Sequence, residues 1–195
     1  MLEIETLVLG ELQNNCYIVS RAGEKNAVVI DPGDDVDRIQ KAVAGKTVAG
    51  VLITHAHYDH ILGLPALKGV PVYVHAQDAA ALTDPVYNCA PEGRVTDVPA
   101  THLLQEGEQV TLAGMTFTVL HTPGHTLGSV CYQCEDCLFT GDTLFAHGYG
   151  RTDLPGGSWP AMAGSLRRLL RMDMGLHLYP GHGESTTLEA VRGKR

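Results

Sequence analysis

The sequence predicts an α/β fold, with strands and helices alternating in the first half of the chain and hairpins dominating the second half. Short apolar segments rich in β-branched residues, such as 27–31 (AVVID) and 50–55 (GVLITH), have the composition of buried strands. Between them, Val36, Ile39 and Val43 recur at the spacing of an amphipathic helix. From residue 98 onward, apolar stretches separated by short turns are typical of hairpins.

The first half is expected to open with a strand, because Ile4, Leu7 and Leu9 stand among polar residues without the basic and apolar regions of a signal peptide. The helix between the early strands is expected over 34–45, with Asp34 as its N-cap. The remaining strands of this half are expected at 16–20, 27–31, 50–55 and 71–75.

The second half is expected to hold two hairpins, at 109–123 and 128–142, and then a helix over 158–172. Ser158 can cap this helix and Pro160 suits its first turn. A final strand at 176–183 and a short helix complete the chain. No linker, repeat or change in composition divides the sequence, so we expect one domain spanning 1–195.

Composition and charge exclude several classes of protein. The 195 residues are 44% apolar, which is enough for a sizeable core, and no apolar run has the length of a membrane span. A net charge of −8 without a basic run disfavours nucleic acids and anionic membranes as partners. Five cysteines, an odd number, argue against a secreted disulfide scaffold. We therefore expect a cytoplasmic protein that acts on a small molecule; its oligomeric state is not predicted.

The segment 54–60 (THAHYDH) concentrates three histidines and an aspartate directly after a predicted strand. In an extended segment, side chains two residues apart point the same way, so His55 and His57 can converge on one point while Asp59 and His60 turn toward a second. Imidazole nitrogens and carboxylate oxygens are ligands of divalent transition metals. Further candidates follow later strands and stand near glycines that allow sharp turns: His125, Asp142 and His182.

These motifs resemble those of the metallo-β-lactamase fold superfamily, and within it those of glyoxalase II-like hydrolases. The resemblance runs over nearly the whole chain, through NCYIV, VVIDPG, THAHYDH, TPGHTLGS, FTGDTLF, GRTDLPGG and YPGHG. It implies an αββα sandwich, two mixed sheets flanked by helices. It also implies two divalent metal ions, with zinc expected and iron or manganese as alternatives. One ion would be held by His55, His57 and His125, the other by Asp59, His60 and His182, with Asp142 bridging.

The resemblance implies hydrolysis of small thioesters, S-lactoylglutathione or related acyl thioesters, by a metal-bridging hydroxide, with Asp59 and Asp142 as catalytic residues. The alternatives are a persulfide dioxygenase with a single iron and a non-catalytic metal-binding domain. The chain departs from the family pattern at Leu62 and Leu127, which bear on the shape of the pocket. The basic helical domain that holds glutathione in longer relatives is not expected here, and the terminal Arg192, Lys194 and Arg195 are expected to form a solvated tail.

Several other residues carry weaker expectations. Tyr149 is a candidate substrate contact or supporting residue, and so are Arg151 and Asp153, which can alternatively form an internal ion pair. The histidines that stand outside any motif are expected to be structural: His75, His102 and His177. Two histidines nearer the motifs, His121 and His147, are candidates for supporting the ligands. Cys134 and Cys137 should face each other across a hairpin turn, and with Cys131 they are expected as reduced thiols, with a disulfide or a metal as alternatives.

Overall fold

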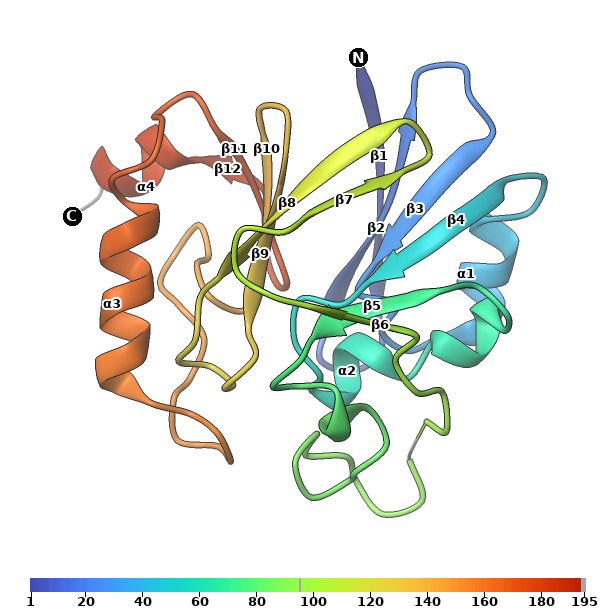
Figure 1. Ribbon diagram of the computed structural model, residues 1–195, viewed down its shortest axis with the longest axis horizontal. Helices are drawn as coiled ribbons and strands as arrows, with labels where there is room; N and C mark the ends of the chain where they lie inside the picture. Colours follow the sequence, from blue (N-terminus) through green and yellow to red (C-terminus); the bar gives the residue numbers. More distant parts are fainter. Residues whose placement is uncertain (95, 194–195) are drawn as a thin grey trace.

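Two six-stranded sheets form the centre of the protein, and the computed structural model describes residues 1–94 and 96–193 (Figure 1). The first sheet has the order β1-β2-β3-β4-β5-β6, formed by Leu2–Leu9, Asn14–Arg21, Asn26–Ile30, Thr47–Leu52, Val72–His75 and His102–Leu104. The second has the order β12-β11-β10-β9-β8-β7, formed by Thr186–Thr187, His177–Pro180, Cys137–Gly141, Val130–Cys134, Met115–His121 and Gln109–Leu112. The helices are α1 (Val36–Ala42), α2 (Tyr58–Ile61), α3 (Trp159–Leu169) and α4 (Leu188–Gly193), with short 3-10 turns η1 (Leu64–Leu67) and η2 (Ala80–Leu82).

Both sheets are mixed, as predicted. In the first sheet, β1, β2 and β3 are antiparallel, whereas β3 to β6 run parallel to their neighbours. In the second, β7 to β10 form an antiparallel meander, and β11 pairs parallel with β10. The two predicted hairpins are therefore confirmed as β7-β8 and β9-β10. Cys134 and Cys137 are directly paired across the second hairpin, and both thiols are free.

Alternation along the central strands builds the four layers. On β2, Tyr17 and Val19 face the second sheet, whereas Cys16 and Ile18 face the layer formed by α1, α2 and η1. The residues facing inward pack against Phe117, Phe139 and other buried side chains of the second sheet. On the outer faces, α1, α2 and η1 cover the first sheet, and α3 and α4 cover the second (Figure 1). The predicted αββα sandwich is confirmed.

Helix α3 begins where the sequence predicts. Ser158 is its N-cap, and the Ser158 hydroxyl accepts a hydrogen bond from the Ala161 backbone N–H at 3.4 Å. Met162, Leu166 and Leu169 form the buried face of the helix, while Leu170 is its C-cap and packs beside that face. None of the helices in the described part of the chain combines the length and the hydropathy needed to cross a bilayer.

The predicted cap of α1 is wrong. The helix begins at Val36 with Asp35 at the N-cap position, and no side chain caps it. The carboxylate of Asp34 instead pairs with Arg94 and accepts a hydrogen bond from the Asp35 N–H at 2.9 Å. Burial alone would raise the pKa of Asp34, but the hydrogen bond from Arg94 outweighs this effect, so the pKa is lowered. Asp34 therefore ties the start of α1 to the loop after η2.

Two short edge strands, β6 and β12, were not predicted from the sequence. They contain three and two residues, respectively, which is too short for a period-two pattern to be visible. Their pairing to β5 and β11 completes the edges of the two sheets. The terminal residues Lys194 and Arg195, expected to form a solvated tail, lie outside the described residues.

A close backbone contact fixes the loop after β8 against α3. Gly124 has φ +141°, and a Cβ atom there would lie 2.4 Å from the backbone nitrogen and the Cα of Met162. We predict that Gly124→Ala lowers the free energy of unfolding by about 3 kcal/mol, because the helix and the loop must separate. Urea unfolding of the purified variant measures this loss.

The matched control is Gly164→Ala, in the interior of α3, where an added Cβ meets nothing within 4 Å. Alanine is the better helix former, so this variant should gain about 1 kcal/mol. A neutral Gly124→Ala would show that the contact between the loop and α3 is loose.

Candidate metal centre

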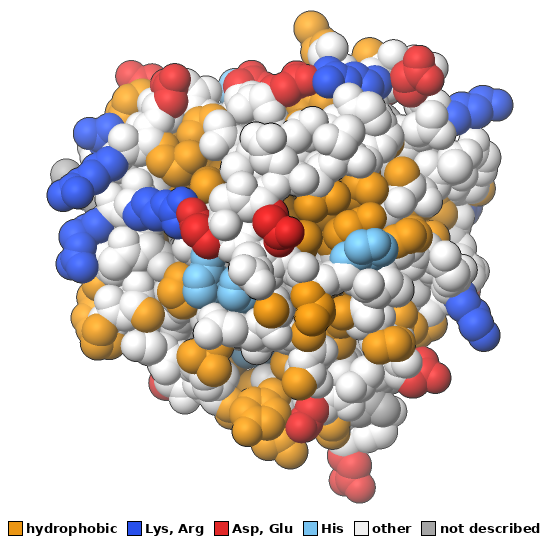
Figure 2. Space-filling model, in the orientation of Figure 1, with side chains coloured by type: hydrophobic (Ala, Val, Ile, Leu, Met, Phe, Trp, Pro, Cys, Tyr) orange, Lys and Arg blue, Asp and Glu red, His pale blue; other side chains and the backbone are white. Residues whose placement is uncertain are grey.

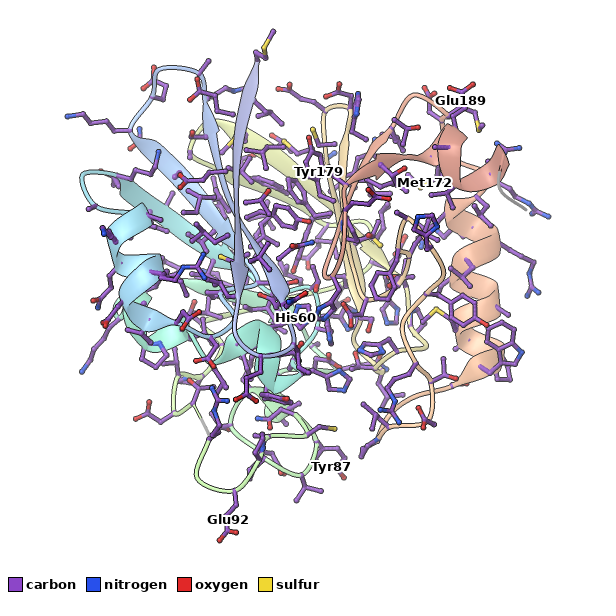
Figure 3. All side chains as sticks on the ribbon, turned by 180° about the vertical axis from the view of Figure 1, so that it is seen from behind. His60, Tyr87, Glu92, Met172, Tyr179 and Glu189 are labelled. Atoms are coloured by element: carbon purple, nitrogen blue, oxygen red, sulfur yellow. The ribbon has the colours of Figure 1, made fainter. Side chains whose placement is uncertain are left out.

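Four loops at the same edge of the two sheets bring seven predicted ligand residues together. The loop after β4 carries the cluster 54–60, and the loops after β8, β10 and β11 carry His125, Asp142 and His182. His60 marks the place of this cluster in Figure 3, close to the ends of the strands. The sequence places the first four side chains in one extended segment, but the helical turn α2 begins at Tyr58, directly after the extended His57. That turn brings Asp59 and His60 together with His182, while the ring of His60 stays next to that of His55, with centroids 4.1 Å apart.

The first group consists of His55, His57 and His125, each buried, with one ring nitrogen apiece lying within 4.8 Å of the others. Nδ1 of His57 lies 2.8 Å from Nε2 of His125. The rings stand edge to face, with centroids 4.5 to 4.8 Å apart. Three imidazoles therefore converge on one point.

The second group consists of Asp59, His60 and His182, which also offer three ligand atoms within 4.8 Å of one another. Nε2 of His60 lies 3.5 Å from Oδ2 of Asp59 and 3.4 Å from Nε2 of His182. Oδ2 of Asp59 lies 3.2 Å from Nε2 of His182. This group is more open than the first, since both Asp59 and His182 are partly exposed.

Asp142 faces both groups at once. Its Oδ2 lies 3.5 Å from Nε2 of His125 in the first group and 3.6 Å from Nε2 of His182 in the second. Its Oδ1 lies 3.5 Å from Nε2 of His60. A carboxylate in this position can contribute an oxygen to a cation on either side.

Unpaired polar atoms show that these residues fit a metal. Among the described residues, neither Nε2 of His55 nor Oδ1 of Asp142 has a hydrogen-bond partner, although both atoms are buried. Such atoms cost free energy unless another group satisfies them. Two ligands of a tetrahedral ion with bonds of about 2.0 to 2.1 Å are separated by about 3.3 Å. Several of the separations above lie near this value and beyond the usual length of a hydrogen bond.

The protonation states of the first group also suit a cation. Burial, reinforced by the neighbouring imidazoles, holds the pKa of His55 well below its ordinary value. Burial and the neighbouring His125 lower the pKa of His57 to about 3. Both rings are therefore neutral at pH 7, which is the form that coordinates a metal.

In the second group, the pKa values of the histidines are raised instead of lowered. Burial alone would lower the pKa of His60, but the charges of Asp59, Asp142 and Asp31 outweigh it and raise the pKa to about 10. Burial would also lower the pKa of His182, but the hydrogen bond to Asp59 outweighs this effect and the pKa is raised. The positive charges of His60 and His182 in turn outweigh burial and lower the pKa of Asp59. The carboxylates thus demand positive charge, which protons or a cation can supply.

Asp31 is a functional residue that the sequence analysis missed. It is buried at the end of β3, and its Oδ2 lies 3.0 Å from Nδ1 of His60. The same carboxylate accepts hydrogen bonds from the N–H and the hydroxyl of Thr54, at 2.7 and 2.6 Å. It thereby fixes the ring of His60 and the start of the ligand loop. Its place in VVIDPG, directly after a strand, was the available signal.

Asp78 is a second missed residue. Its Oδ2 accepts hydrogen bonds from the Ala56 N–H at 3.0 Å and from the Thr126 hydroxyl at 2.7 Å. Its Oδ1 accepts one from the Gly128 N–H at 2.7 Å. Ala56 lies between two histidines of the first group and Thr126 follows the third. A single buried carboxylate therefore joins the two loops that supply this group.

The loop after Asp142 supports the site through its backbone. The carbonyl oxygen of Arg151 accepts a hydrogen bond from Nδ1 of His125 at 2.7 Å. The guanidinium of Arg151 forms two hydrogen bonds of 2.7 Å with the carboxylate of Asp153, so the internal pair is present, and both side chains are exposed. Tyr149 packs against Trp159, with ring centroids 5.3 Å apart.

The remaining histidines lie in other surroundings. His75 and His121 stack at 4.1 Å between centroids, and His102 stacks on Tyr73. The side chain of His121 hydrogen-bonds the carbonyl oxygen of Leu127, and His147 lies beside Glu184. His177 is an exposed residue of β11. Within the described part of the chain, no group of three possible metal ligands includes a cysteine.

Comparisons with known proteins find similar sequences that span nearly the whole chain. A family profile described as Metallo-beta-lactamase superfamily matches residues 9–182. The chain is 32% identical to the hydroxyacylglutathione hydrolase GloC of Haemophilus influenzae, over 96% of this chain and 93% of that protein. It is 33% identical to the probable metallo-hydrolase YqgX of Bacillus subtilis, over 91% and 89%.

Solved structures give the same result. The BLEG-1 B3 metallo-beta-lactamase superimposes with a TM-score of 0.91 and 35% identity, covering 96% of this chain and 95% of that one. TTHA1623 in a di-iron-bound form gives 0.80 and 34%, covering 95% and 96%. ETHE1 from Myxococcus xanthus gives 0.79 and 30%, covering 96% and 80%.

The role of Asp31 can be tested through stability. We predict that Asp31→Ala lowers the free energy of unfolding of the metal-stripped protein by about 3 kcal/mol, because Thr54 and His60 lose their buried partner. Urea unfolding monitored by circular dichroism measures the change. The control Asp97→Ala, at an exposed position, should stay within about 0.5 kcal/mol of the original protein. Equal stability of the two variants would contradict the assignment.

Proposed function

The chain belongs to the metallo-beta-lactamase superfamily, and on this premise we propose that it is a metal-dependent hydrolase of small acyl thioesters, with an activity like that of a hydroxyacylglutathione hydrolase. The observation that carries the proposal is the position of Asp142 between two groups of three ligands. That arrangement suits two divalent cations sharing one carboxylate, with zinc as the expected metal and iron or manganese as alternatives. The proposed ligand sets are His55, His57 and His125 for one cation and Asp59, His60 and His182 for the other.

A pair of bound cations supplies a hydroxide at neutral pH and polarises the carbonyl of the substrate. The protein's residues hold the geometry for this chemistry. Asp31 fixes the ring of His60 through Nδ1, and the Arg151 carbonyl fixes that of His125. Both contacts leave the Nε2 atoms directed at the centre of the site. Pre-set orientation of this kind lowers the reorganisation needed in the transition state.

Asp59 and Asp142 are the proposed catalytic carboxylates. The lowered pKa of Asp59 keeps it ionised across the neutral range, so it can accept a hydrogen bond from the attacking water. Asp59 is partly exposed, which gives it access to an incoming substrate. Asp142 lies between the two groups, where its carboxylate could contribute oxygens to the cations that would hold the reacting hydroxide.

The likeness to GloC favours S-lactoylglutathione or a related thioester as substrate. We expect weak binding of the glutathione part, because the guanidinium of Arg151 is already paired with the carboxylate of Asp153. It is therefore not free for a glutathione carboxylate in this arrangement. We therefore propose poor saturation by S-lactoylglutathione and acceptance of other acyl thioesters.

The likeness to BLEG-1 raises a second candidate, hydrolysis of β-lactams. Both reactions open an acyl bond with the same kind of nucleophile, so the two activities can be compared on one metal-loaded preparation. A kcat/KM for a chromogenic cephalosporin above that for acyl thioesters would favour this candidate.

Metal content and activity test the proposal together. We predict about two transition-metal ions per chain by elemental analysis, and loss of thioester hydrolysis after chelation. Asp142→Ala should lose at least one ion and lower kcat/KM by about a thousand-fold, or about 4 kcal/mol. The control His102→Ala alters an exposed ring stacked on Tyr73 and should keep both ions.

Three results would contradict the proposal. Near-normal metal content and activity in Asp142→Ala would show that Asp142 is not a carboxylate shared by two cations. A single iron with thiol-dependent oxygen consumption would favour the persulfide dioxygenase, in which one cluster histidine, His125 and Asp142 would hold the metal. Two bound ions without turnover of any acyl substrate would favour a metal-binding domain.

Metal affinity should depend on pH differently at the two groups. His60, with a pKa raised to about 10, must lose a proton to coordinate, whereas His57, with a pKa lowered to about 3, is already neutral. Binding at the second group should therefore tighten as pH rises from about 6 to 9 and release protons. Calorimetric titration of the stripped protein with Zn²⁺, in two buffers of different ionisation enthalpy, counts these protons. Binding at both groups without proton release would contradict the charge assignment.

A further inference from the structure

An apolar pocket of about 330 Å³ lies beside the first ligand group. It is enclosed by η2 and by the loops that contain Leu127 and Pro155. Its apolar lining consists of Ala56, Ala80, Ala81, Tyr87, Leu127 and Pro155. Ala56 lies between His55 and His57, so the wall of the pocket is continuous with the ligand loop. A volume of this size suits a small ligand or part of one.

The buried polar side chains of the pocket, Asp78 and Thr126, already form hydrogen bonds within the protein. Both carboxylate oxygens of Asp78 accept hydrogen bonds from the surrounding loops, and the hydroxyl of Thr126 donates one of them. No lysine or arginine is among the lining residues. The other polar groups of the lining are the amide of Gln77 and the hydroxyl of Tyr87, both on exposed residues. An uncharged, largely apolar group therefore meets no unsatisfied partner there, whereas a carboxylate meets no cation.

Apolar side chains also stand exposed at the rim. Tyr87 is 57% exposed and Leu127 54% exposed, and Val86 beside Tyr87 is 70% exposed. Figure 2 shows hydrophobic side chains gathered at the lower edge of the molecule, over the loop that follows η2, and Figure 3 places Tyr87 on that loop. Clustered exposed apolar residues next to a candidate active site are typical of a binding surface.

We propose that this pocket binds an uncharged hydrocarbon substituent of the thioester substrate. The inference rests on the proposed function and names the class of substrate: a medium-chain thioester, with the reacting carbonyl at the ligand cluster and the chain along Ala56 toward η2. Each methylene that the pocket buries should raise kcat/KM about four-fold, which is about 0.8 kcal/mol expressed as a ratio. Charged parts of the substrate would lie outside the pocket.

Two substrate series on the zinc-loaded enzyme test the proposal. In the first, the acyl group grows from acetyl to octanoyl on N-acetylcysteamine, a small neutral thiol. In the second, the acyl group stays acetyl and the thiol grows from ethyl to octyl. We expect kcat/KM to rise three- to five-fold per methylene in one series until the pocket is full. The series that shows the rise identifies the side of the thioester from which the chain comes.

A substitution that fills the pocket should remove this dependence. Ala80 is exposed on η2 and lines the pocket, so Ala80→Trp should lower the ratio of kcat/KM for hexanoyl to that for acetyl thioester at least ten-fold. Ala76 is also exposed but does not line the pocket, so the control Ala76→Trp should keep both the ratio and the activity.

Direct binding separates the two proposals. The uncleavable thioether S-hexyl-N-acetylcysteamine should bind the enzyme at least ten-fold tighter than its S-methyl analogue by calorimetry, and Ala80→Trp should abolish the difference. Hydrolysis of acetyl thioester with no effect of chain length in either series would overturn the pocket assignment and leave the proposed function standing. Failure to hydrolyse any thioester would overturn the proposed function, and equal binding of the two thioethers would then overturn the pocket assignment as well.

Discussion

The convergence of carboxylates and imidazoles on one buried point is the constraint on which the rest of the structure depends. Asp59, Asp142 and Asp31 surround His60, and their charges raise its pKa to about 10 against the effect of burial. Charges of one sign held this close in a partly buried site repel one another unless positive charge is supplied. A loose loop would relieve the repulsion by moving apart. The two sheets prevent this, because each ligand loop starts at a strand fixed by pairing on both sides.

The supporting carboxylates divide this task between them. Asp31 ties the end of β3 to Thr54 and His60, on the side of the second group. Asp78 ties the loop after β5 to the backbone on either side of the first group, at Ala56 and Gly128. Each anion is buried and is compensated by three or more donors, which is the condition under which a buried carboxylate is tolerated. The ligand loops are thereby positioned by carboxylates that lie outside the two proposed ligand groups.

The sequence predicts those parts of the site whose residues are close together in the chain, and it does not predict the parts that depend on contacts between distant residues. His55, His57, Asp59 and His60 stand out because they are adjacent in sequence, and the αββα layers follow from alternation along strands such as β2. Asp31 and Asp78 do not stand out, because a single aspartate after a strand is common and their partners lie 22 to 50 residues away. The predicted N-cap of α1 was wrong for the same reason, because Asp34 forms an ion pair with Arg94, which lies on another loop.

The pocket beside the cluster shows how the chemistry and the choice of substrate can be separated in such a fold. The ligands follow strands of both sheets, whereas the pocket lining comes mostly from η2 and from loops, where a side chain can change with little effect on the core. Asp78 belongs to both parts, because it joins the ligand loops and forms part of the wall of the pocket. Its hydrogen bonds satisfy both of its oxygens, so neither oxygen presents an unpaired acceptor to the pocket. Saturation of this one carboxylate by its own loops therefore lets an apolar surface lie directly beside a site built for cations.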